Sequence, residues 1–248
     1  MGVLKMQQPN KDTQLGVTVV LPAINEADII EQAVKKVSQT LEAYGCTYEV
    51  IIAEDGSTDG TDKKADELTQ KLLYVRHLHS EKRLGRGLAL KNSFRQSTGN
   101  VLIYMDVDLA TDLKHLSQLI NAVTVEDCML ATGSRMLSQS NVKRTFTRNL
   151  VSKVYNFMVR LFLGSKIRDH QCGFKAFQRE ILLPLLDEVS ANHWFWDTEV
   201  LVRAQRKGYK VKEIPVNWAG IRETKVKLFK DSLNMGWQVF ILWIHLHF

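Results

Sequence analysis

The segment Gly99-Asn-Val-Leu-Ile-Tyr-Met-Asp-Val-Asp-Leu-Ala-Thr-Asp112 carries the clearest structural signal in this chain. Its apolar run, Val101 to Met105, is typical of a strand buried on both faces of a parallel sheet. Asp106 and Asp108 follow at alternate positions, so both side chains can leave the strand end on one side. Open α/β sheets bind ligands there, and paired carboxylates suit Mg²⁺ or Mn²⁺ shared with a diphosphate. Alternatively, the aspartates only cap a helix that starts near Asp112.

Composition describes a globular chain with a preference for anionic partners. Its 248 residues are 45% hydrophobic and 24% charged, enough for one large α/β domain with a full core. Three scattered cysteines indicate reduced thiols in a cytosolic compartment. Residues 1–14 lack the layout of a signal peptide and are expected to be a flexible lead-in. The net charge of +6 favours nucleotide phosphates, anionic lipid or nucleic acid without choosing among them.

Hydropathy outside the central segment alternates between strand and helix periods. We expect strands at residues 17–21, 48–53, 73–78, 101–105 and 128–132. Helices are expected after Asn25 as N-cap, after Thr58 or Asp59, and over residues 87–97 and 113–123. Strands separated by helices of this length predict βαβ units and a mostly parallel, doubly wound sheet.

Polar loops follow the first three expected strands. A carboxylate such as Asp55 can accept hydrogen bonds from a nucleotide base or from ribose hydroxyls. The basic loop from Glu81 to Gly87 has two glycines that let backbone N–H groups approach phosphate at a helix start. It matches neither the Walker loop nor the Rossmann fingerprint. For Asn25, Glu26 and Asp55 singly, helix capping is the competing interpretation.

Eight motifs in order resemble the family 2 inverting glycosyltransferases of GT-A fold, specifically the dolichyl- or polyprenyl-phosphate sugar synthases. The resemblance runs from residue 17 to about residue 230 and is closest to the dolichyl-phosphate glucosyltransferase branch. One departure is Ala23-Ile24, where the family usually has an aromatic residue. The motifs are Val-Val-Leu-Pro-Ala-Ile-Asn-Glu (19–26), Glu-Asp-Gly-Ser-Thr-Asp-Gly-Thr (54–61), Gly-Arg-Gly-Leu-Ala-Leu (85–90), Met-Asp-Val-Asp-Leu (105–109), Gly-Ser-Arg (133–135), Asp-His-Gln-Cys-Gly-Phe-Lys (169–175), Trp-Phe-Trp-Asp-Thr-Glu (194–199) and Glu-Ile-Pro-Val-Asn-Trp (213–218).

The resemblance implies a GT-A-like, Rossmann-type α/β domain over residues 15–227 and metal-dependent, inverting transfer of a hexose. The donor would be a nucleotide sugar of the UDP-glucose or GDP-mannose type, and the acceptor dolichyl or polyprenyl phosphate. The product would be a lipid-linked sugar donor for protein glycosylation. Asp106 and Asp108 would hold Mg²⁺ or Mn²⁺, and they would be catalytic together with Arg135 and Asp197. The nucleotide-sugar site would comprise Pro22, Asn25, Glu26, Asp55, Ser57, Arg83, Gly85, Lys91 and Asp106.

Arg135, Arg222 and Lys225 would bind the acceptor phosphate in this interpretation. Arginine offers a planar, always charged fork that suits phosphate. A hydroxyl acceptor of a glycolipid or polysaccharide is the alternative, and it would use Asp197 as general base. A second alternative is a haloacid-dehalogenase-like phosphohydrolase, although Thr111 stands one position late for that motif. Charge alone suggests a nucleic-acid binder, and no aromatic and basic motif supports one.

The C-terminal segment, residues 228–248, is expected to be amphipathic and membrane-associated. Its apolar run from Trp237 is too short to cross a bilayer, so it either lies in the interface or begins a longer span. The expected helix from Arg144 to Leu163 either lies on a membrane or packs on the core. We therefore expect a protein at the cytoplasmic face of a membrane, anchored peripherally or C-terminally. The histidine pairs 77/79 and 245/247 lack an evident third ligand, and no zinc is expected there.

Overall fold

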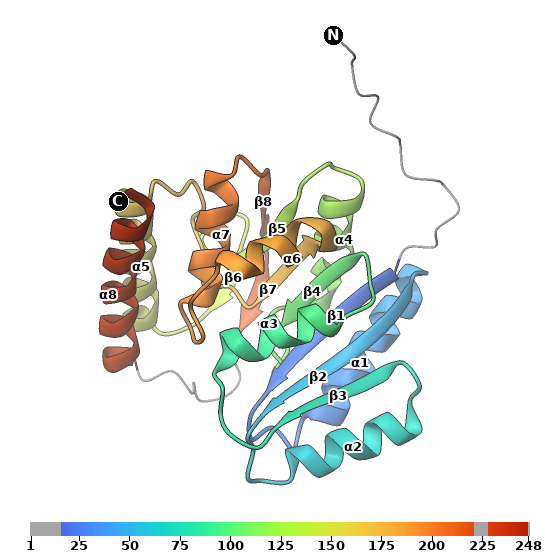
Figure 1. Cartoon of the computed structure of the whole chain (residues 1–248). Coiled ribbons are helices and arrows are strands. Elements are labelled where there is room, and N and C mark those ends of the chain that lie inside the picture. The colour runs from blue at the N-terminus through green and yellow to red at the C-terminus, as the bar shows by residue number, and fades with distance from the viewer. Residues whose placement is uncertain (1–15, 221–227, 248) are drawn as a thin grey trace.

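A seven-stranded sheet in the order β3-β2-β1-β4-β7-β5-β8 forms the centre of the fold, with helices on both faces (Figure 1). The structure is a computed structural model that describes residues 16–220 and 228–247. A two-stranded sheet of β6 and β9 lies apart from the main sheet. The strands are β1 (Gly16–Ala23), β2 (Thr47–Asp55), β3 (Val75–Ser80), β4 (Val101–Met105), β5 (Leu130–Ser134), β6 (Asn141–Lys143), β7 (Phe174–Gln178), β8 (Val211–Pro215) and β9 (Asn217–Ala219).

The helices are α1 (Ile30–Tyr44), α2 (Thr61–Lys71), α3 (Arg86–Gln96), the short 3₁₀ helix η1 (Leu113–His115), α4 (Leu116–Thr124), α5 (Phe146–Leu163), α6 (Arg179–Glu188), α7 (Trp196–Arg206) and α8 (Leu228–His247). Helices α1, α2 and α4 cover one face of the main sheet and α3, α6 and α7 the other, and the remaining helices lie beside these layers. One hydrophobic core joins the sheet to α1, α2 and α4, and a second joins it to α3, α6 and α7. Along β4, Ile103 packs into the first core and Leu102 and Tyr104 into the second, as the two-residue period of a strand requires.

The predicted, mostly parallel α/β sheet is confirmed, with β7 as the antiparallel exception. Strand β7 pairs with both β4 and β5 in the opposite direction, with Met105 opposite Phe174. Because β7 is reversed, its first residue rather than its last lies beside the carboxyl end of β4. The segment that precedes β7, residues 169–173, therefore reaches the edge where ligands of α/β sheets bind.

The start of the first helix differs from the sequence expectation. Asn25 is not the N-cap of α1, which begins at Ile30. Asn25 has a positive φ of 51° and its side-chain oxygen accepts a hydrogen bond from the backbone N–H of Thr58 at 2.8 Å. The Asn25 side chain therefore binds the neighbouring loop at Thr58 instead of capping the helix, which the local sequence had predicted. By contrast, the helix expected near Asp112 is capped by Asp112 itself, whose side chain accepts from the backbone N–H of Lys114 at the start of η1.

Helices α5 and α8 pack against each other at the end of the molecule opposite β3 (Figure 1). Tyr155 and Val159 of α5 and Val239 and Leu242 of α8 are buried in a third core, which also includes residues of α7. The core-facing alternative for the α5 segment is therefore correct for one side of that helix. Within residues 16–220 and 228–247, no helix has both the length and the apolar character needed to span a bilayer.

Candidate active site

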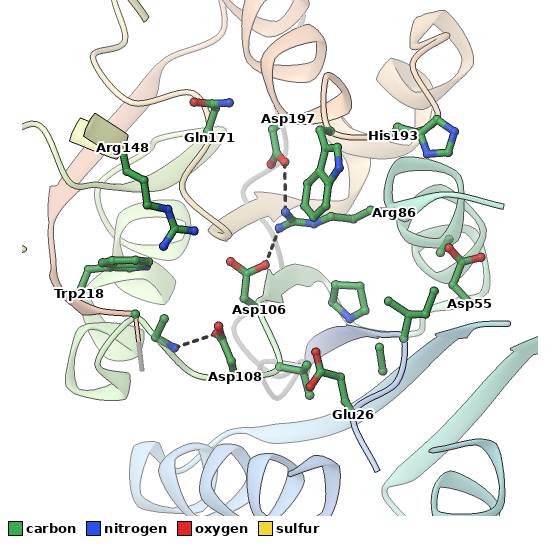
Figure 2. Close-up of a pocket in the computed structure, with 18 of the residues that line it drawn as sticks. Glu26, Asp55, Arg86, Asp106, Asp108, Arg148, Gln171, His193, Asp197 and Trp218 are labelled. Atoms are coloured by element: carbon green, nitrogen blue, oxygen red, sulfur yellow. Dashed lines mark hydrogen bonds and ion pairs between the residues drawn. The ribbon is translucent and has the colours of Figure 1, made fainter. Parts of the chain in front are cut away.

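The carboxyl ends of β1, β4 and β5 open into a pocket of about 490 Å³ (Figure 2). Other parts of its lining come from the start of α3, from α5, from the segment before β7, from α7 and from α8. Most predicted site residues meet here, although they are far apart in the sequence. Those that line the pocket are Pro22, Asn25, Glu26, Asp55, Arg83, Asp106, Asp108, Arg135 and Asp197.

One side of the pocket carries four carboxylates, Glu26, Asp55, Asp106 and Asp108, which we call the carboxylate wall. The residues follow β1, end β2 and follow β4, so three neighbouring parallel strands deliver them to one edge. The pair Asp106 and Asp108 after Met105 predicted such a group of carboxylates at the carboxyl ends of the strands.

Asp106 lies at the centre of the pocket and fits there only because residue 173 is glycine. Its backbone N–H donates to the carbonyl of Gly173 at 3.0 Å. A Cβ atom added to Gly173 would lie 2.1 Å from the carboxylate oxygen Oδ2 of Asp106. The Gln-Cys-Gly-Phe-Lys motif therefore supplies the space in which the first aspartate of the pair sits.

Asp108 lies in a turn after β4, and its Oδ1 accepts from the backbone N–H of Ala110 at 3.0 Å (Figure 2). Burial raises the pKa of Asp108 above its ordinary value, and the neighbouring Asp106 raises it further. Two partly buried carboxylates that repel each other are stabilised by a shared cation. Oxygen ligands of this kind fit Mg²⁺ or Mn²⁺, so the residues present suit the metal that the sequence predicts.

Asp55 holds the basic loop in place. Its two oxygens accept from the backbone N–H groups of Leu84, at 2.6 Å, and Gly85, at 2.9 Å. Gly85 has a φ of 98°, and a Cβ there would lie 2.2 Å from the ring nitrogen Nδ1 of His193. A glycine is therefore required both by the backbone and by the close approach of the His193 loop.

Three predicted nucleotide-site residues lie beside or away from the pocket lining. Ser57 accepts from the backbone N–H of Asn25 at 3.0 Å and so supports the loop after β1. Gly85 is the partner of Asp55 described above. Lys91 points elsewhere, donating to the carbonyl of Val189 at 3.2 Å. Arg222 and Lys225 lie outside the described residues, and their predicted role stays a prediction.

Arg86 is a central pocket residue that was not predicted from the sequence. Its guanidinium donates to Asp106 at 2.7 Å and lies 4.0 Å from Asp197 (Figure 2). It also stacks near the rings of Tyr104 and Trp194, at 5.2 and 5.3 Å from their centroids. The signal was present in the Gly-Arg-Gly motif, where an arginine at the first turn of α3 stands between two glycines.

The pocket lining also includes Arg135, Arg144 and Arg148, which follow β5 or lie at the start of α5 and its approach, and which we call the basic wall. The guanidinium of Arg135 binds Asp169 through two hydrogen bonds of 2.7 and 2.9 Å and lies 5.7 Å from the ring centroid of Trp218. Burial alone would raise the pKa of Asp169, but the charge of Arg135 lowers it well below its ordinary range. The charge of Arg135 is thus held in a fixed position, and two of its guanidinium N–H groups are already bound to Asp169.

The other two arginines of the basic wall come from the start of α5 and its approach. Arg144 donates to Asn149 at 2.9 Å and to Ser152 at 3.2 Å, and burial lowers its pKa to about 10. Arg148 lines the pocket and forms no ion pair within the described residues. Among the three, Arg148 is therefore the arginine best able to bind an incoming anion.

Asp197 forms a buried ion pair with Lys175 at 3.0 Å. Burial raises the pKa of Asp197 and lowers the pKa of Lys175, because each charged form loses its hydration. Lys175 also donates to the carbonyl oxygens of His170, at 3.0 Å, and Cys172, at 2.5 Å. Asp197 therefore lines the pocket, as predicted, but as half of an internal pair.

Comparison with known proteins agrees with this geometry. Residues 18–185 match the model of the glycosyl transferase family 2. Glycosyltransferase AglD of Haloferax volcanii is 48% identical over 98% of this chain, which spans only 40% of that protein. Human dolichyl-phosphate beta-glucosyltransferase is 32% identical over 88% of this chain and 72% of its own length.

The fold also matches a solved structure. Glucosyl-3-phosphoglycerate synthase from Mycobacterium tuberculosis, in complex with UDP, superimposes with a TM-score of 0.69 at 23% identity, over 94% of this chain and 79% of that one. The predicted GT-A-like fold is thereby confirmed. The chain belongs to glycosyl transferase family 2, and this membership replaces the phosphohydrolase and nucleic-acid alternatives.

Proposed function

We propose that this family 2 glycosyltransferase transfers a hexose from a nucleotide sugar to dolichyl or polyprenyl phosphate, with inversion at the anomeric carbon. The observation that carries the proposal is a single pocket lined both by the carboxylate wall and by the arginines of the basic wall. The first wall suits a cation and a diphosphate, and the second suits a further anion. The product would be a lipid-linked sugar that serves as donor for protein glycosylation.

For the donor, we favour UDP-glucose. The human relative is named a dolichyl-phosphate beta-glucosyltransferase, and the mycobacterial synthase has been solved with Mn²⁺ and UDP-glucose. Asp106 and Asp108 would hold the divalent cation, which when bound would stabilise charge on the leaving diphosphate. Arg86 lies between Asp106 and Asp197, where its charge can act on the same leaving group.

For the acceptor, we favour a phosphate anion held by the basic wall. Its oxygen would attack the anomeric carbon while the bond from that carbon to the diphosphate oxygen breaks, and the bonding electrons would leave with the nucleoside diphosphate. A phosphate oxygen is already ionised at neutral pH, so the step needs no strong base. That agrees with Asp197 being paired to Lys175 at 3.0 Å.

A hydroxyl acceptor is the second candidate, and one observation favours it. Asp197 lines the pocket, and burial raises its pKa to about 7, the value expected of a general base that works near neutral pH. The two candidates differ in which residue turnover requires. A phosphate acceptor requires the basic wall, whereas a hydroxyl acceptor requires Asp197.

The deciding experiment pairs two acceptors that differ only in the phosphate. Enzyme, Mn²⁺ and a panel of nucleotide sugars are incubated with a short polyprenyl phosphate or with the matching polyprenol, and the lipid products are identified by mass. We expect product from the phosphate alone, and Asp197→Asn to reduce its formation by about tenfold or less. Product from the free alcohol, abolished by Asp197→Asn, would establish the second candidate instead.

We also propose that the chain approaches its lipid at a membrane surface through α5 and α8. Side chains spaced at helical intervals on the outer side of each helix are large, apolar and exposed. They are Phe146, Leu150, Val154, Phe157 and Leu161 on α5 and Trp237, Phe240, Ile241 and Ile244 on α8. The same α5 supplies Arg148 to the pocket, so a lipid phosphate would meet the basic wall from this side. The free cysteines are compatible with the cytoplasmic face.

Liposome binding tests this surface without deleting α8, whose Val239 and Leu242 are buried. We expect the triple substitution Trp237→Ser, Phe240→Ser and Ile244→Ser to release the protein from anionic vesicles in a sedimentation assay. The matched control is Leu73→Ser, because Leu73 is fully exposed near the opposite end of the sheet. Equal vesicle binding by the triple variant and the parent would show that membrane contact lies elsewhere.

A further inference from the structure

Three potential metal ligands meet away from the pocket, at the edge of the sheet formed by β2 and β3. One ligand atom each from Glu54, His77 and His79 lies within 4.8 Å of the other two. The sequence predicts no zinc at the histidine pair 77/79, because it shows no evident third ligand. Pairing of β2 with β3 places Glu54 directly opposite His79 and supplies a third potential ligand, which the sequence alone did not reveal.

His77 is oriented as metal-binding histidines are. Its side chain is only 6% exposed, and its Nδ1 lies 2.7 Å from the carboxylate of Asp66 on α2. Its other ring nitrogen, Nε2, is buried and has no hydrogen-bond partner. A histidine whose one nitrogen is held by a carboxylate presents the other to a metal with fixed direction and increased basicity. A buried nitrogen without any partner is otherwise costly.

Glu54 and His79 complete the cluster from neighbouring strands. The Glu54 side chain is fully buried, and its Oε2 lies 2.5 Å from Nδ1 of His79. Its other oxygen accepts from the backbone N–H of Ser57. His79 is 45% exposed in its side chain, so an ion can enter from solvent on that side. Two strands in register thus hold a carboxylate and an imidazole at a short, fixed separation.

We propose that Glu54, His77 and His79 bind one Zn²⁺ ion, with Asp66 orienting His77 and a water molecule as fourth ligand. Two imidazoles and one carboxylate are a ligand set typical of zinc, whereas the oxygen ligands Asp106 and Asp108 suit Mg²⁺ or Mn²⁺. Bound zinc would fasten β2 to β3 and, through Asp66, to α2. Because Glu54 precedes Asp55, the ion would also steady the strand end that carries the carboxylate wall.

The test measures metal binding directly, without turnover, so its outcome is independent of the proposed transfer reaction. The full chain is stripped with a chelator and titrated with Zn²⁺ by calorimetry, and then with Co²⁺, whose visible spectrum reports tetrahedral nitrogen and oxygen ligands. We expect one Zn²⁺ per chain and a higher thermal unfolding midpoint with zinc. His79→Gln should weaken binding by about 100-fold or more, and Asp66→Asn by about tenfold.

Two controls assign the ion to this cluster. His245→Gln removes a histidine of the exposed pair on α8 and should leave zinc affinity unchanged. The double variant Asp106→Asn and Asp108→Asn should also bind Zn²⁺ as the parent does. If His79→Gln does not fold, Asp66→Asn still tests the proposal because Asp66 is exposed. Parental affinity in both His79→Gln and Asp66→Asn, or loss of zinc only in the double aspartate variant, would overturn the inference.

Discussion

The two walls of the pocket are held in place by different means. The carboxylate wall is anchored by backbone groups: Asp55 accepts from the amides of Leu84 and Gly85, and Asp108 from that of Ala110. The basic wall is anchored by side chains, chiefly the bidentate pair of Arg135 with Asp169. Backbone contacts keep their geometry over a wide range of conditions, whereas an ion pair depends on the charge of both partners. The carboxylate wall is therefore held mainly by backbone groups, apart from the ion pair of Asp106 with Arg86, and the basic wall is held by side-chain charges.

The largest effect is expected at the carboxylate wall. Asp108→Asn removes a charged oxygen ligand but keeps the size of the side chain and its hydrogen bond to Ala110. We expect the turnover number to fall by about 1,000-fold or more, which corresponds to about 4 kcal/mol of transition-state stabilisation. The measurement is the rate of lipid product formation with saturating Mn²⁺.

A chelator should abolish the activity of the parent, and added Mn²⁺ should restore it. The unfolding midpoint of Asp108→Asn should stay close to that of the parent, or rise, because burial and Asp106 already disfavour the ionised form. Activity that survives both excess chelator and Asp108→Asn would show that this wall does not hold a cation.

A smaller effect is expected at the basic wall, and Arg148 is the cleanest probe. Arg148→Ala removes one charge-assisted contact, of about 1.5–3 kcal/mol. We expect kcat/KM for polyprenyl phosphate to fall by about 10- to 100-fold while the affinity for the nucleotide sugar stays within about twofold. Steady-state kinetics with each substrate varied in turn measures both.

Arg135→Ala is less direct, because it leaves the buried Asp169 unpaired and should cost about 3–5 kcal/mol of folding stability. Arg148→Lys is the matched control, since it keeps the charge and loses the fork, and it should recover only part of the activity. Equal loss of donor and acceptor binding in Arg148→Ala would contradict the division of the pocket into two walls.

The smallest effect is expected on lowering the pH, which should first reduce the stability of the region that holds the basic wall. His170, next to Asp169, is buried with its ring nitrogens 2.7 Å from Ser165 and Asn156, and burial lowers its pKa to about 3. Between pH 6.5 and about 3 the unfolded chain therefore binds a proton that the folded chain does not, so stability falls as pH falls. His170 alone accounts for up to about 1.4 kcal/mol of unfolding free energy per pH unit.

Urea unfolding at pH 7 and pH 5 measures this slope. In His170→Gln the slope should decrease by about one bound proton, whatever the change in absolute stability. The exposed His245→Gln should keep the parental slope. A slope that His170→Gln leaves unchanged would mean that acid acts on another part of the molecule.

The sequence predicted the carboxylate wall well because strand, turn and carboxylate are adjacent in the chain. The strand Val101–Met105 was predicted to the residue, and Asp106 and Asp108 line the pocket as expected. Parallel strands that alternate with helices bring such ends to one edge without any further information. The motifs that follow β1 and β2 were located by the same reasoning.

The remaining features depend on contacts between distant segments. The reversed direction of β7 could not be predicted from its five residues, because a short buried strand has the same apolar pattern in either direction. In the sequence, Arg86 resembles any other cation of a basic loop. Lys91, on the same helix, was predicted to bind the nucleotide sugar but points away from the pocket. Asn25 resembled a cap because its partner, Thr58, is 33 residues away. The third ligand of the histidine cluster was likewise not evident, because Glu54 is distant in the sequence and reaches His79 only through the pairing of β2 with β3.

The reversed strand marks the end of the sheet that lies farthest from the pocket, and this end is suited to labelling the protein. Because β7 runs antiparallel, its last residues, Phe177 and Gln178, pair with the first residues of β4 and lie at the opposite edge of the sheet from Asp106. At about 3.3 Å per residue, the length of β4 separates that edge from the pocket by roughly 15 Å. Glu126, whose carbonyl accepts from Lys210 near the start of β8, lies at this far edge as well. A fluorophore or short peptide tag attached at Glu126 would lie far from the pocket and should leave the transfer reaction unaffected.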